Sequence, residues 1–441
     1  CGRRRAAMAR DGGMTRDRGR GAPRDRRAGT EARRSSRSPH TPRALPTVRD
    51  GVSGPDIAIV LPRGAQRFMR GHPWIFRSDV LIAPTVAAGV VQVRTPEGRP
   101  LGHALWSPAS EISLRRLDAD PARAIDAAWW HERIGDAIAR RAHIGEQASA
   151  LRLVHGEGDG LPSLVVDRYD RWLVVQLLSA GLEAHRATIV EALLAHTDAA
   201  GILARHDVAV RDREGLPREV SLLHGSVPET IRVQEHGVAF LAAPWDGQKT
   251  GAFLDQRDNR ALVGRLARGR ALDCFAYHGS FALHLARQAD EVIALDVSAP
   301  ALARAAENAA LNGFTNVRTE LGDAFDVLRA WQRAGERFDT IVVDPPAFAK
   351  SRANVEAALR GYKDINLRAM RLLAPGGLLF SASCSHHVGL GLFLEMLRDA
   401  AADSGRRLAV REVTGHAADH PDVLTIPETS YLKGVLLEAL D

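Results

Sequence analysis

Short apolar segments alternate with longer segments of helical spacing in the carboxyl-terminal part of this 441-residue sequence. Each apolar segment has the length of a buried strand and ends at a turn or a polar residue. Strands that alternate with helices in this way predict the α/β class, with a doubly wound, largely parallel sheet of Rossmann-like topology. The expected strands are residues 271–275, 291–296, 340–344 and 378–383, and the expected helices are residues 281–288 and 298–312.

The last of these strands ends at Cys384, between Ser383 and Ser385. Ligands of open α/β sheets bind beyond the carboxyl ends of the strands, so this thiol lies where a reactive group would be needed. Free cysteine is also among the residue types most often buried in protein cores. The strand by itself therefore leaves two interpretations open, a catalytic nucleophile and a packing residue.

Positive charge is concentrated in the first 50 residues, which carry a net charge of +10, whereas the rest of the chain carries −4. Residues 1–54 are rich in Arg, Gly, Ser and Pro and lack apolar periodicity, which predicts a disordered tail. The tail is either a basic arm that attracts RNA or an upstream extension of the reading frame. The second interpretation rests on Met8 and Met14, which closely follow Cys1.

The three cysteines, Cys1, Cys274 and Cys384, have a spacing that matches neither a disulfide framework nor a metal-binding motif. No apolar run approaches the roughly 20 residues that cross a bilayer. We therefore expect a cytoplasmic protein without a metal.

Residues 55–125 predict a small β-rich domain, in which Arg67, Arg70 and Trp74 belong to a segment where cations alternate with aromatic side chains. Such a segment suits RNA, because guanidinium groups bind phosphates and rings stack on bases. The aromatic side chains are equally compatible with a core. The expected features are strands at 57–61, 89–94, 101–106 and 112–116, and a basic turn at 62–64.

Two further domains are predicted beyond residue 125. Residues 126–244 form a central α/β domain, with helices expected at 121–148 and 185–196, and residues 245–441 form the domain with the parallel sheet.

Acidic residues lie at the ends of successive strands of the predicted parallel sheet: Asp273, Asp296 and Asp323. A carboxylate after the second strand can bind the hydroxyls of a ribose, and Gly279 lets a ligand approach the turn after the first strand. The turn has one glycine rather than the G-x-G-x-x-G pattern that cradles a pyrophosphate. This difference favours S-adenosylmethionine (SAM) over a dinucleotide.

Asp344 is held in a rigid turn by Pro345 and Pro346 at the mouth of the same site. Such turns hold an amino nitrogen in amino-group methyltransferases. Cys384 indicates a different chemistry, in which a thiolate adds to carbon 6 of cytosine and makes carbon 5 nucleophilic. Asp344 would then steady ring nitrogen 3 as charge accumulates there.

Lysine is rare in this chain, which contains 55 arginines but only Lys249, Lys350, Lys363 and Lys433. A lysine retained in such a composition indicates a position that needs a compact point charge. Lys249 and Lys350 are the best candidates for contacts to an RNA phosphate or to the cofactor carboxylate.

Eight sequence blocks, which follow one another along the chain in the order of the family, resemble the bacterial 23S rRNA cytosine-C5 methyltransferases of the large-subunit methyltransferase I type. The resemblance extends from about Pro55 to the end of the chain. One departure is His278-Gly279-Ser280, where Thr-Gly-Gly is common in the family. The blocks are residues 247–251, 254–258, 273–277, 344–346, 360–366, 383–385, 418–421 and 431–434.

The resemblance implies an amino-terminal PUA domain that binds RNA, a central α/β domain and a Rossmann-like SAM-dependent catalytic domain with Cys384 as the nucleophile. We therefore expect formation of 5-methylcytosine in 23S rRNA through a covalent cysteine adduct, with a homodimer as one option for assembly. The alternatives are a base-amino RNA methyltransferase and a SAM-binding RNA-binding protein without activity. The base that removes the carbon-5 proton is not identified, although His386 and His387 are candidates.

The expected site residues fall into three groups. They are Cys384 and Asp344 for catalysis, Asp273, Phe275, Tyr277, Gly279, Asp296, Asp323, Ala324 and Pro345 for SAM, and Arg67, Arg70, Trp74, Lys249 and Lys350 for RNA.

Overall fold

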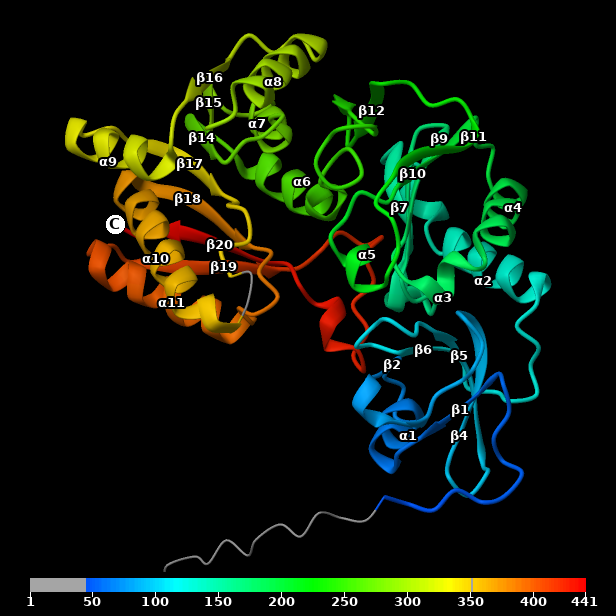
Figure 1. The fold of residues 1–441 in the computed structure, drawn as a ribbon. Coiled ribbons are helices and arrows are strands. Elements are labelled where there is room, and N and C mark those ends of the chain that lie inside the picture. Colours follow the sequence, from blue (N-terminus) through cyan, green and yellow to red (C-terminus); the bar gives the residue numbers. More distant parts are fainter. Residues whose placement is uncertain (1–44, 350–351) are drawn as a thin grey trace, which may run out of the picture. The chain divides into compact units, whose positions relative to one another are not determined.

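The computed structural model describes residues 45–349 and 352–441 (Figure 1). The predictions for residues 1–44 and for Lys350 lie outside the described residues. Of the predicted tail, residues 45–54 are described, and in this segment Val52 is buried and packs against Gly98.

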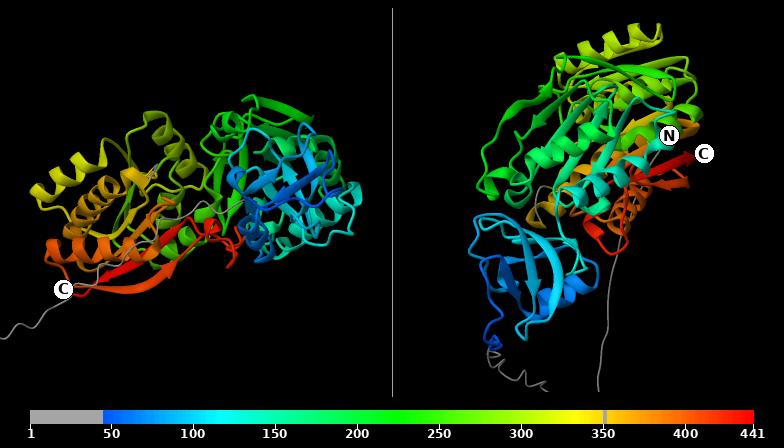
Figure 2. Two further views of the ribbon diagram at one scale, coloured as in Figure 1. Left: turned by 60° about the horizontal axis from the view of Figure 1, so that its bottom comes forward. Right: turned by 90° about the vertical axis from the view of Figure 1, so that its right-hand side faces the viewer.

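The first sheet has six strands in the order β2-β6-β5-β4-β1-β3 and curls on itself, blue to cyan in Figures 1 and 2. Strands β1 and β4 are parallel, and the other neighbours are antiparallel. All four strands expected here are confirmed. The strands are β1 Ile57–Val60, β2 Trp74–Ile75, β3 Val80–Ile82, β4 Gly89–Arg94, β5 Pro100–Trp106 and β6 Leu114–Asp118.

The basic turn expected at 62–64 is wrong, because these residues open helix α1, Pro62–Met69. Proline suits the first position of a helix, where its missing N–H would have no intrahelical partner and its φ is already helical. Phe68 then packs with Val91 and Ala104 in the core of the sheet.

The second sheet has five strands in the order β11-β10-β9-β8-β7, and a separate hairpin follows it. The long helix expected at 121–148 is shorter, because Asp126 caps its start by accepting from Trp129 N at 3.0 Å. The strands are β7 Ala150–His155, β8 Leu164–Tyr169, β9 Trp172–Leu177, β10 Gly201–Arg205, β11 Val220–Gly225, and β12 Ile231–Glu235 with β13 Val238–Ala242 in the hairpin. The helices are α2 Ala127–Ala139, α3 Ala180–Glu183, α4 Arg186–His196 and α5 Val210–Arg213.

The third sheet has seven strands in the order β16-β15-β14-β17-β18-β20-β19. Strands β14 to β18 run parallel, and β20 lies antiparallel between β18 and β19. The predicted doubly wound fold is thus confirmed. The strands are β14 Arg270–Cys274, β15 Glu291–Asp296, β16 Val317–Leu321, β17 Phe338–Val343, β18 Leu373–Ser383, β19 Leu408–Thr414 and β20 Lys433–Ala439. The helices are α6 Arg257–Leu266, α7 Ser280–Leu285, α8 Ala299–Leu311, α9 Ala324–Ala334, α10 Val355–Leu372 and α11 Leu390–Ser404.

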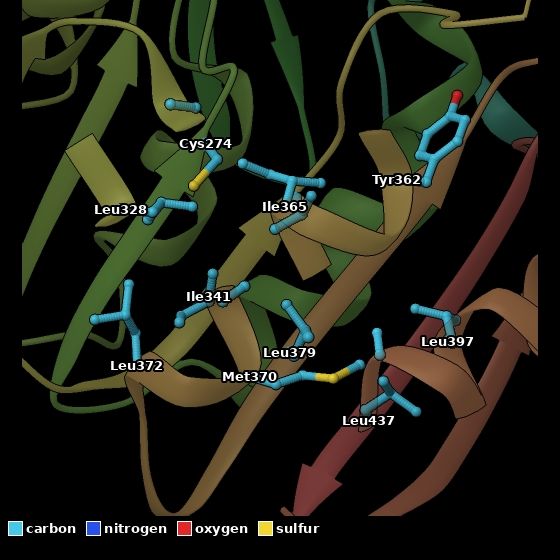
Figure 3. Close-up of a cluster of buried hydrophobic side chains, with 14 of the residues drawn as sticks. Cys274, Leu328, Ile341, Tyr362, Ile365, Met370, Leu372, Leu379, Leu397 and Leu437 are labelled. Atoms are coloured by element: carbon cyan, nitrogen blue, oxygen red, sulfur yellow. The ribbon is translucent and has the colours of Figure 1, made fainter. Parts of the chain in front are cut away.

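Both faces of this sheet are covered by helices. On one face, Leu272 and Cys274 of β14 pack with side chains of α9, α10 and α11, a cluster that Figure 3 shows. On the other face, Ala271 packs with side chains of α6, α7 and α8. Burial on both faces explains why the parallel strands read as nearly continuous apolar runs in the sequence.

The chain reverses its direction of winding at the centre of the sheet. Strand β14 is bonded to β15 on one side and to β17 on the other, so the connections that leave β14 and β17 diverge. Such a divergence leaves a crevice at the carboxyl ends of the two strands, which is the usual ligand site of this fold. Within the described ranges, no helix is long and apolar enough to span a membrane.

A fully buried ion pair joins hairpin β12–β13 to helix α6. Arg260 donates to both carboxylate oxygens of Glu235, at 2.5 and 2.7 Å, and His284 lies 3.0 Å from the same carboxylate. Burial opposes ionisation of Glu235, but Arg260 and His284 together hold its pKa well below the usual value. The pair is therefore charged throughout the neutral range.

We predict that Glu235→Ala lowers the free energy of unfolding by about 3–5 kcal/mol, because it leaves Arg260 as an uncompensated buried charge. Urea denaturation followed by circular dichroism measures the change. The matched control is Glu229→Ala at an exposed position of the same part of the chain, where we expect a change within about 0.5 kcal/mol. Equal losses of unfolding free energy in the two variants would contradict the stabilising role assigned to the ion pair of Glu235 and Arg260.

Candidate active site

A cavity of about 570 Å³ opens at the carboxyl ends of β14, β15, β17 and β18. Its volume suits a nucleoside-sized ligand. Its lining includes both residues predicted for catalysis, six of the eight predicted for SAM, and Lys249. These residues are Lys249, Phe275, Tyr277, Asp296, Asp323, Ala324, Asp344, Pro345 and Cys384.

The turn after β14 has an unusual backbone. Phe275 and Tyr277 adopt φ values of 65° and 50°, and Lys249, which also lines the cavity, has a φ of 55°. Positive φ costs free energy in residues other than glycine and tends to persist where a functional site is built. Six such residues occur in the described part of the chain, and these three line the same cavity.

Asp273 and Gly279, both predicted to contact SAM, lie behind the cavity wall. Asp273 is buried and accepts from Ala282 N in the first turn of α7 at 2.9 Å, and burial raises its pKa well above the usual value. Gly279 has a φ of 84°, and a Cβ atom added there would lie 2.9 Å from Cβ of Ala305 on α8. Both residues shape the turn, and neither belongs to the cavity lining.

Asp296 and Asp323 face the cavity while their carboxylates hold local backbone. Asp296 accepts from Tyr277 N at 2.8 Å and from Ser298 N at 2.9 Å, which ties the turn after β14 to the turn after β15. Asp323 caps α9 by accepting from Phe325 N at 2.8 Å. A carboxylate oxygen has more than one lone pair, so each acid retains acceptor capacity toward a ligand.

Asp344 follows β17 directly and faces a second acid, Asp255. Burial and the negative charge of Asp255 raise the pKa of Asp344 to about 6. Burial also opposes ionisation of Asp255, but Lys249, His420 and hydrogen bonds hold the pKa of Asp255 well below its usual value. Two of these bonds come from Lys249 Nζ at 2.6 Å and Tyr431 Oη at 2.7 Å. At neutral pH Asp255 is therefore ionised, and Asp344 is poised to exchange a proton.

Cys384 is the first residue after β18, and it lines the same cavity as Asp344. Burial, with a further contribution from the Asp344 carboxylate, raises the pKa of the Cys384 thiol to about 11. The resting group is therefore a thiol. Cys274, in contrast, lies wholly in the core cluster of Figure 3.

The residues predicted for RNA binding are divided between two places. Lys249 lines the cavity, whereas the other described residues of this group belong to the first sheet and helix α1. Arg70 is exposed, Arg67 stacks on Phe76, and Trp74 donates from its indole nitrogen to Glu157 at 2.9 Å. The RNA-binding roles of these residues stay a prediction.

Asp255, Tyr362 and Lys433 surround the catalytic candidates but were given no catalytic role from the sequence. Asp255 lies in the cavity wall, and one of its oxygens, Oδ1, is buried without a hydrogen-bond partner among the described residues. Tyr362 and Lys433 contact the residues beside Cys384. All three lie in sequence blocks that carried the family resemblance, which was the available signal.

Comparison with known proteins agrees with this geometry. A family model described as S-adenosylmethionine-dependent methyltransferase matches residues 151–436, and a PUA-like domain model matches residues 58–119. A SAM-dependent methyltransferase fold from Streptococcus mutans superposes with a TM-score of 0.74 at 19% identity, covering 87% of this chain and 99% of that one. A second solved structure, a methyltransferase in complex with SAH, gives the same TM-score at 18% identity and the same coverage. The chain is therefore of the SAM-dependent methyltransferase class, and SAM is its cofactor.

Curated relatives define the family more closely. Ribosomal RNA large subunit methyltransferase I of Shewanella amazonensis is 42% identical over 390 residues, which cover 86% of this chain and 98% of that protein. The proteins of the same name from Aeromonas salmonicida and Shigella boydii are 39% and 38% identical, with coverage of 87% and 86% of this chain and 99% and 98% of theirs. The chain belongs to the ribosomal RNA large subunit methyltransferase I family. In the described ranges, no group of three or more His, Cys, Asp or Glu side chains is arranged to hold a metal.

The two acids of the cavity predict opposite effects of pH on stability. Because the pKa of Asp344 is raised to about 6, the folded protein binds more protons than the unfolded chain between about pH 4 and pH 6. The destabilising effect of this carboxyl therefore grows as the pH rises through that window and is complete above it. We predict that Asp344→Asn melts close to the wild type at pH 4 and several degrees above it at pH 7.

Asp255→Asn is the matched comparison, because the pKa of Asp255 is lowered. Its carboxylate stabilises the fold above the unfolded pKa of about 4, and this contribution is lost as the pH falls further. The variant should melt below the wild type at pH 7 and approach it in acid. Thermal denaturation from pH 7 down to below about pH 4 measures both differences, and two differences of the same sign at pH 7 would contradict the assigned pKa values.

Proposed function

We propose that this protein is a SAM-dependent methyltransferase that forms 5-methylcytosine in 23S rRNA through a covalent adduct with Cys384. The observation that carries the proposal is the placement of Cys384 and Asp344 at the ends of neighbouring strands β18 and β17, in one cavity. The ribosomal substrate is supported by the names of the curated relatives.

The cavity residues fit the cofactor. The turn after β14 has no run of glycines for a pyrophosphate, and the acids at the ends of β15 and β16 can accept from hydroxyl and amino groups of an adenosyl moiety. We assign Phe275, Tyr277, Asp296, Asp323, Ala324 and Pro345 to direct contacts with SAM. Asp273 and Gly279 would act through the shape of the turn. When bound, SAM supplies an electrophilic methyl group.

Catalysis begins with the thiol of Cys384, whose sulfur adds to carbon 6 of the target cytosine. The thiol must lose its proton, and the nearby Asp344 carboxylate, with a pKa of about 6, is ionised at neutral pH and can accept it. The same carboxyl can then deliver the proton to ring nitrogen 3 as negative charge accumulates there. This transfer leaves carbon 5 nucleophilic and returns Asp344 to its ionised form.

After methyl transfer, a base takes the proton from carbon 5 and the bond between sulfur and carbon 6 breaks. The proton on ring nitrogen 3 returns through Asp344 to the sulfur, which regenerates the thiol and leaves neutral 5-methylcytosine. His386 and His387 are both exposed on the loop that follows Cys384. They stay candidates for this base. The ring of His386 is partly shielded from solvent, and this shielding, with the charges of Lys433 and His387, lowers its pKa.

RNA binding is assigned to the PUA-like domain, which we place at residues 55–125, with Arg67, Arg70 and Trp74 on its surface. The central domain, residues 126–244, connects it to the catalytic domain, residues 245–441. A target base would have to leave its stack to reach a cavity at the strand ends.

We predict that Cys384→Ser abolishes methyl transfer to unmodified 23S rRNA but still binds SAH, because a serine hydroxyl is far less nucleophilic than a thiol. Mass spectrometry of nucleosides from the treated RNA identifies the product. Cys274→Ala is the control and should retain activity, since Cys274 is a core residue. Full activity in Cys384→Ser with methylation of an amino group would favour the base-amino alternative.

The adduct itself can be trapped with RNA containing 5-fluorocytidine, because carbon 5 then carries no proton that a base can remove. The wild type should form a complex stable to denaturing gels, and Cys384→Ser should form none. If no methyl transfer to 23S rRNA occurred under any condition, the protein would be a SAM-binding RNA-binding protein without this activity.

We predict that Asp296→Ala weakens SAH binding by about tenfold or more, because hydrogen bonds to a charged group contribute about 1.5–3 kcal/mol. The variant also releases Tyr277 N from its acceptor. Isothermal titration calorimetry measures the affinity, with Asp290→Ala, an exposed acid just before β15, as the control. An unchanged affinity in Asp296→Ala would exclude Asp296 from the cofactor site.

A further inference from the structure

Cys384 lies between two buried serines that bond to the same hydroxyl group. Ser383 Oγ donates to Tyr362 Oη at 3.0 Å, and Ser385 Oγ lies 3.0 Å from the same atom. Ser385 Oγ also accepts from Ala349 N at 3.3 Å, just beyond the turn of Asp344. The Tyr362 hydroxyl therefore holds both neighbours of the thiol, and the Ser385 hydroxyl links that segment to the segment of the catalytic acid.

The ring of Tyr362 is fixed as firmly as its hydroxyl. Tyr362 projects from α10 and is fully buried. Its ring centroid lies 4.7 Å from that of Phe348 and 5.9 Å from that of Phe393. Side chains held by packing and hydrogen bonds together are the usual support of a preorganised catalytic group.

Lys433 lies on the other side of the same segment, and its cationic group has an unusual environment. Its Nζ donates to the carbonyl oxygens of Ser385 and Tyr431, both at 2.8 Å, and the residue is only 5% exposed. Lys433 is paired in register with Ser383 across β20 and β18, so it is one residue removed from Cys384.

The ammonium group of Lys433 has no carboxylate within salt-bridge distance among the described residues. The two other lysines of the described ranges differ, because Lys249 pairs with Asp255 at 2.6 Å and Lys363 with Asp403 at 2.8 Å. A buried cation without an anion costs free energy. That cost is offset if an anion forms beside it during the reaction.

We propose that Lys433 is a positioning residue whose charge favours the thiolate of Cys384, while Tyr362 fixes the thiol relative to Asp344. The proposal rests on the proposed role of Cys384 as nucleophile. Lys433 keeps its proton throughout, and the thiol proton passes to Asp344 as described above. The cation therefore acts through its field and through the carbonyl of Ser385, without contact to substrate.

The remaining charges around the thiol do not supply this role. Asp344 and Asp255 disfavour a thiolate, and Lys249, which favours it, is already paired with Asp255. Burial lowers the pKa of Lys433 to about 8, whereas the charge of Cys384 acts to raise it, so each group favours the ionised form of the other. The titratable and charged groups that face this segment are Asp344, Asp255, Lys249, Tyr362, His386 and Lys433.

The test measures the thiol directly, without RNA or SAM. Alkylation of Cys384 by iodoacetamide is followed between pH 7 and pH 10.5 by mass spectrometry of its peptide. Lys433→Gln keeps an amide that can donate to the two carbonyl oxygens but removes the charge. We expect it to raise the apparent pKa of the thiol by about one unit, which slows alkylation about tenfold at pH 7, where Lys433 is protonated.

Tyr362→Phe is the matched variant, because it keeps the ring and the charge of Lys433 but loses the hydroxyl. We expect an alkylation profile close to that of the wild type and a kcat for methyl transfer reduced about tenfold, with KM for SAM within about twofold. SAH binding and thermal denaturation establish that both variants are folded.

An alkylation profile of Lys433→Gln that coincides with the wild type would overturn the proposal. The role of Lys433 would then be limited to its hydrogen bonds to the two carbonyl oxygens, and its charge would have no effect on the thiol. A shift in Tyr362→Phe equal to that in Lys433→Gln would overturn it as well. Failure of the proposed function is distinguishable, because Cys384→Ser would then retain methyl transfer whatever the alkylation profiles show.

Discussion

The register of three parallel strands places the catalytic candidates. Cys274 at the end of β14 lies opposite Val343 at the end of β17, and Val343 lies opposite Ser381 of β18. The turns after β14 and β17 therefore begin at the same position along the strand direction. Strand β18 continues for two residues beyond that position before Cys384. Because side chains alternate between the faces of a sheet, a slip of one residue would turn every core side chain to the wrong face. The core clusters on the two faces of this sheet thus fix the strand register, and the register fixes the geometry of the cavity.

The central part of the chain contributes to the cavity by holding the segment that precedes α6. Thr250 donates to Asp167 of β8 at 2.5 Å, and Arg152 of β7 binds both oxygens of the same carboxylate. On the other side of this segment, Arg257 donates to the buried Asp419 at 2.8 Å. Buried polar groups that are all partnered specify one arrangement, and this one keeps Lys249 at a positive φ in the cavity wall. The strain at Lys249 is thus stabilised by contacts outside the catalytic sheet.

The parallel sheet could be predicted because its strands are buried on both faces and its turns carry glycine, proline and acidic residues. The helix at Pro62 was missed because proline and glycine also mark turns, and only the packing of Phe68 decides between the two. Asp273 illustrates another limit, since a strand-end acid can cap a helix as readily as it can bind a ligand. The environment of Cys384 was beyond sequence reasoning, because Tyr362 and Lys433 reach it from α10 and β20, elements that only the tertiary fold brings together.

The surroundings of Lys363 and Lys433 show where a lysine can be replaced by arginine and where a compact cation is needed. Lys363 pairs with Asp403 near the surface, where an arginine would serve as well, so composition alone identifies no function. Lys433 differs, because two carbonyl oxygens accept from its single buried nitrogen, an arrangement that suits a compact ammonium group better than the broader fork of a guanidinium. Burial lowers the pKa of Lys433 to about 8, whereas an arginine would stay charged. A compact cation that has no carboxylate partner among the described residues suits the thiolate that we propose for Cys384.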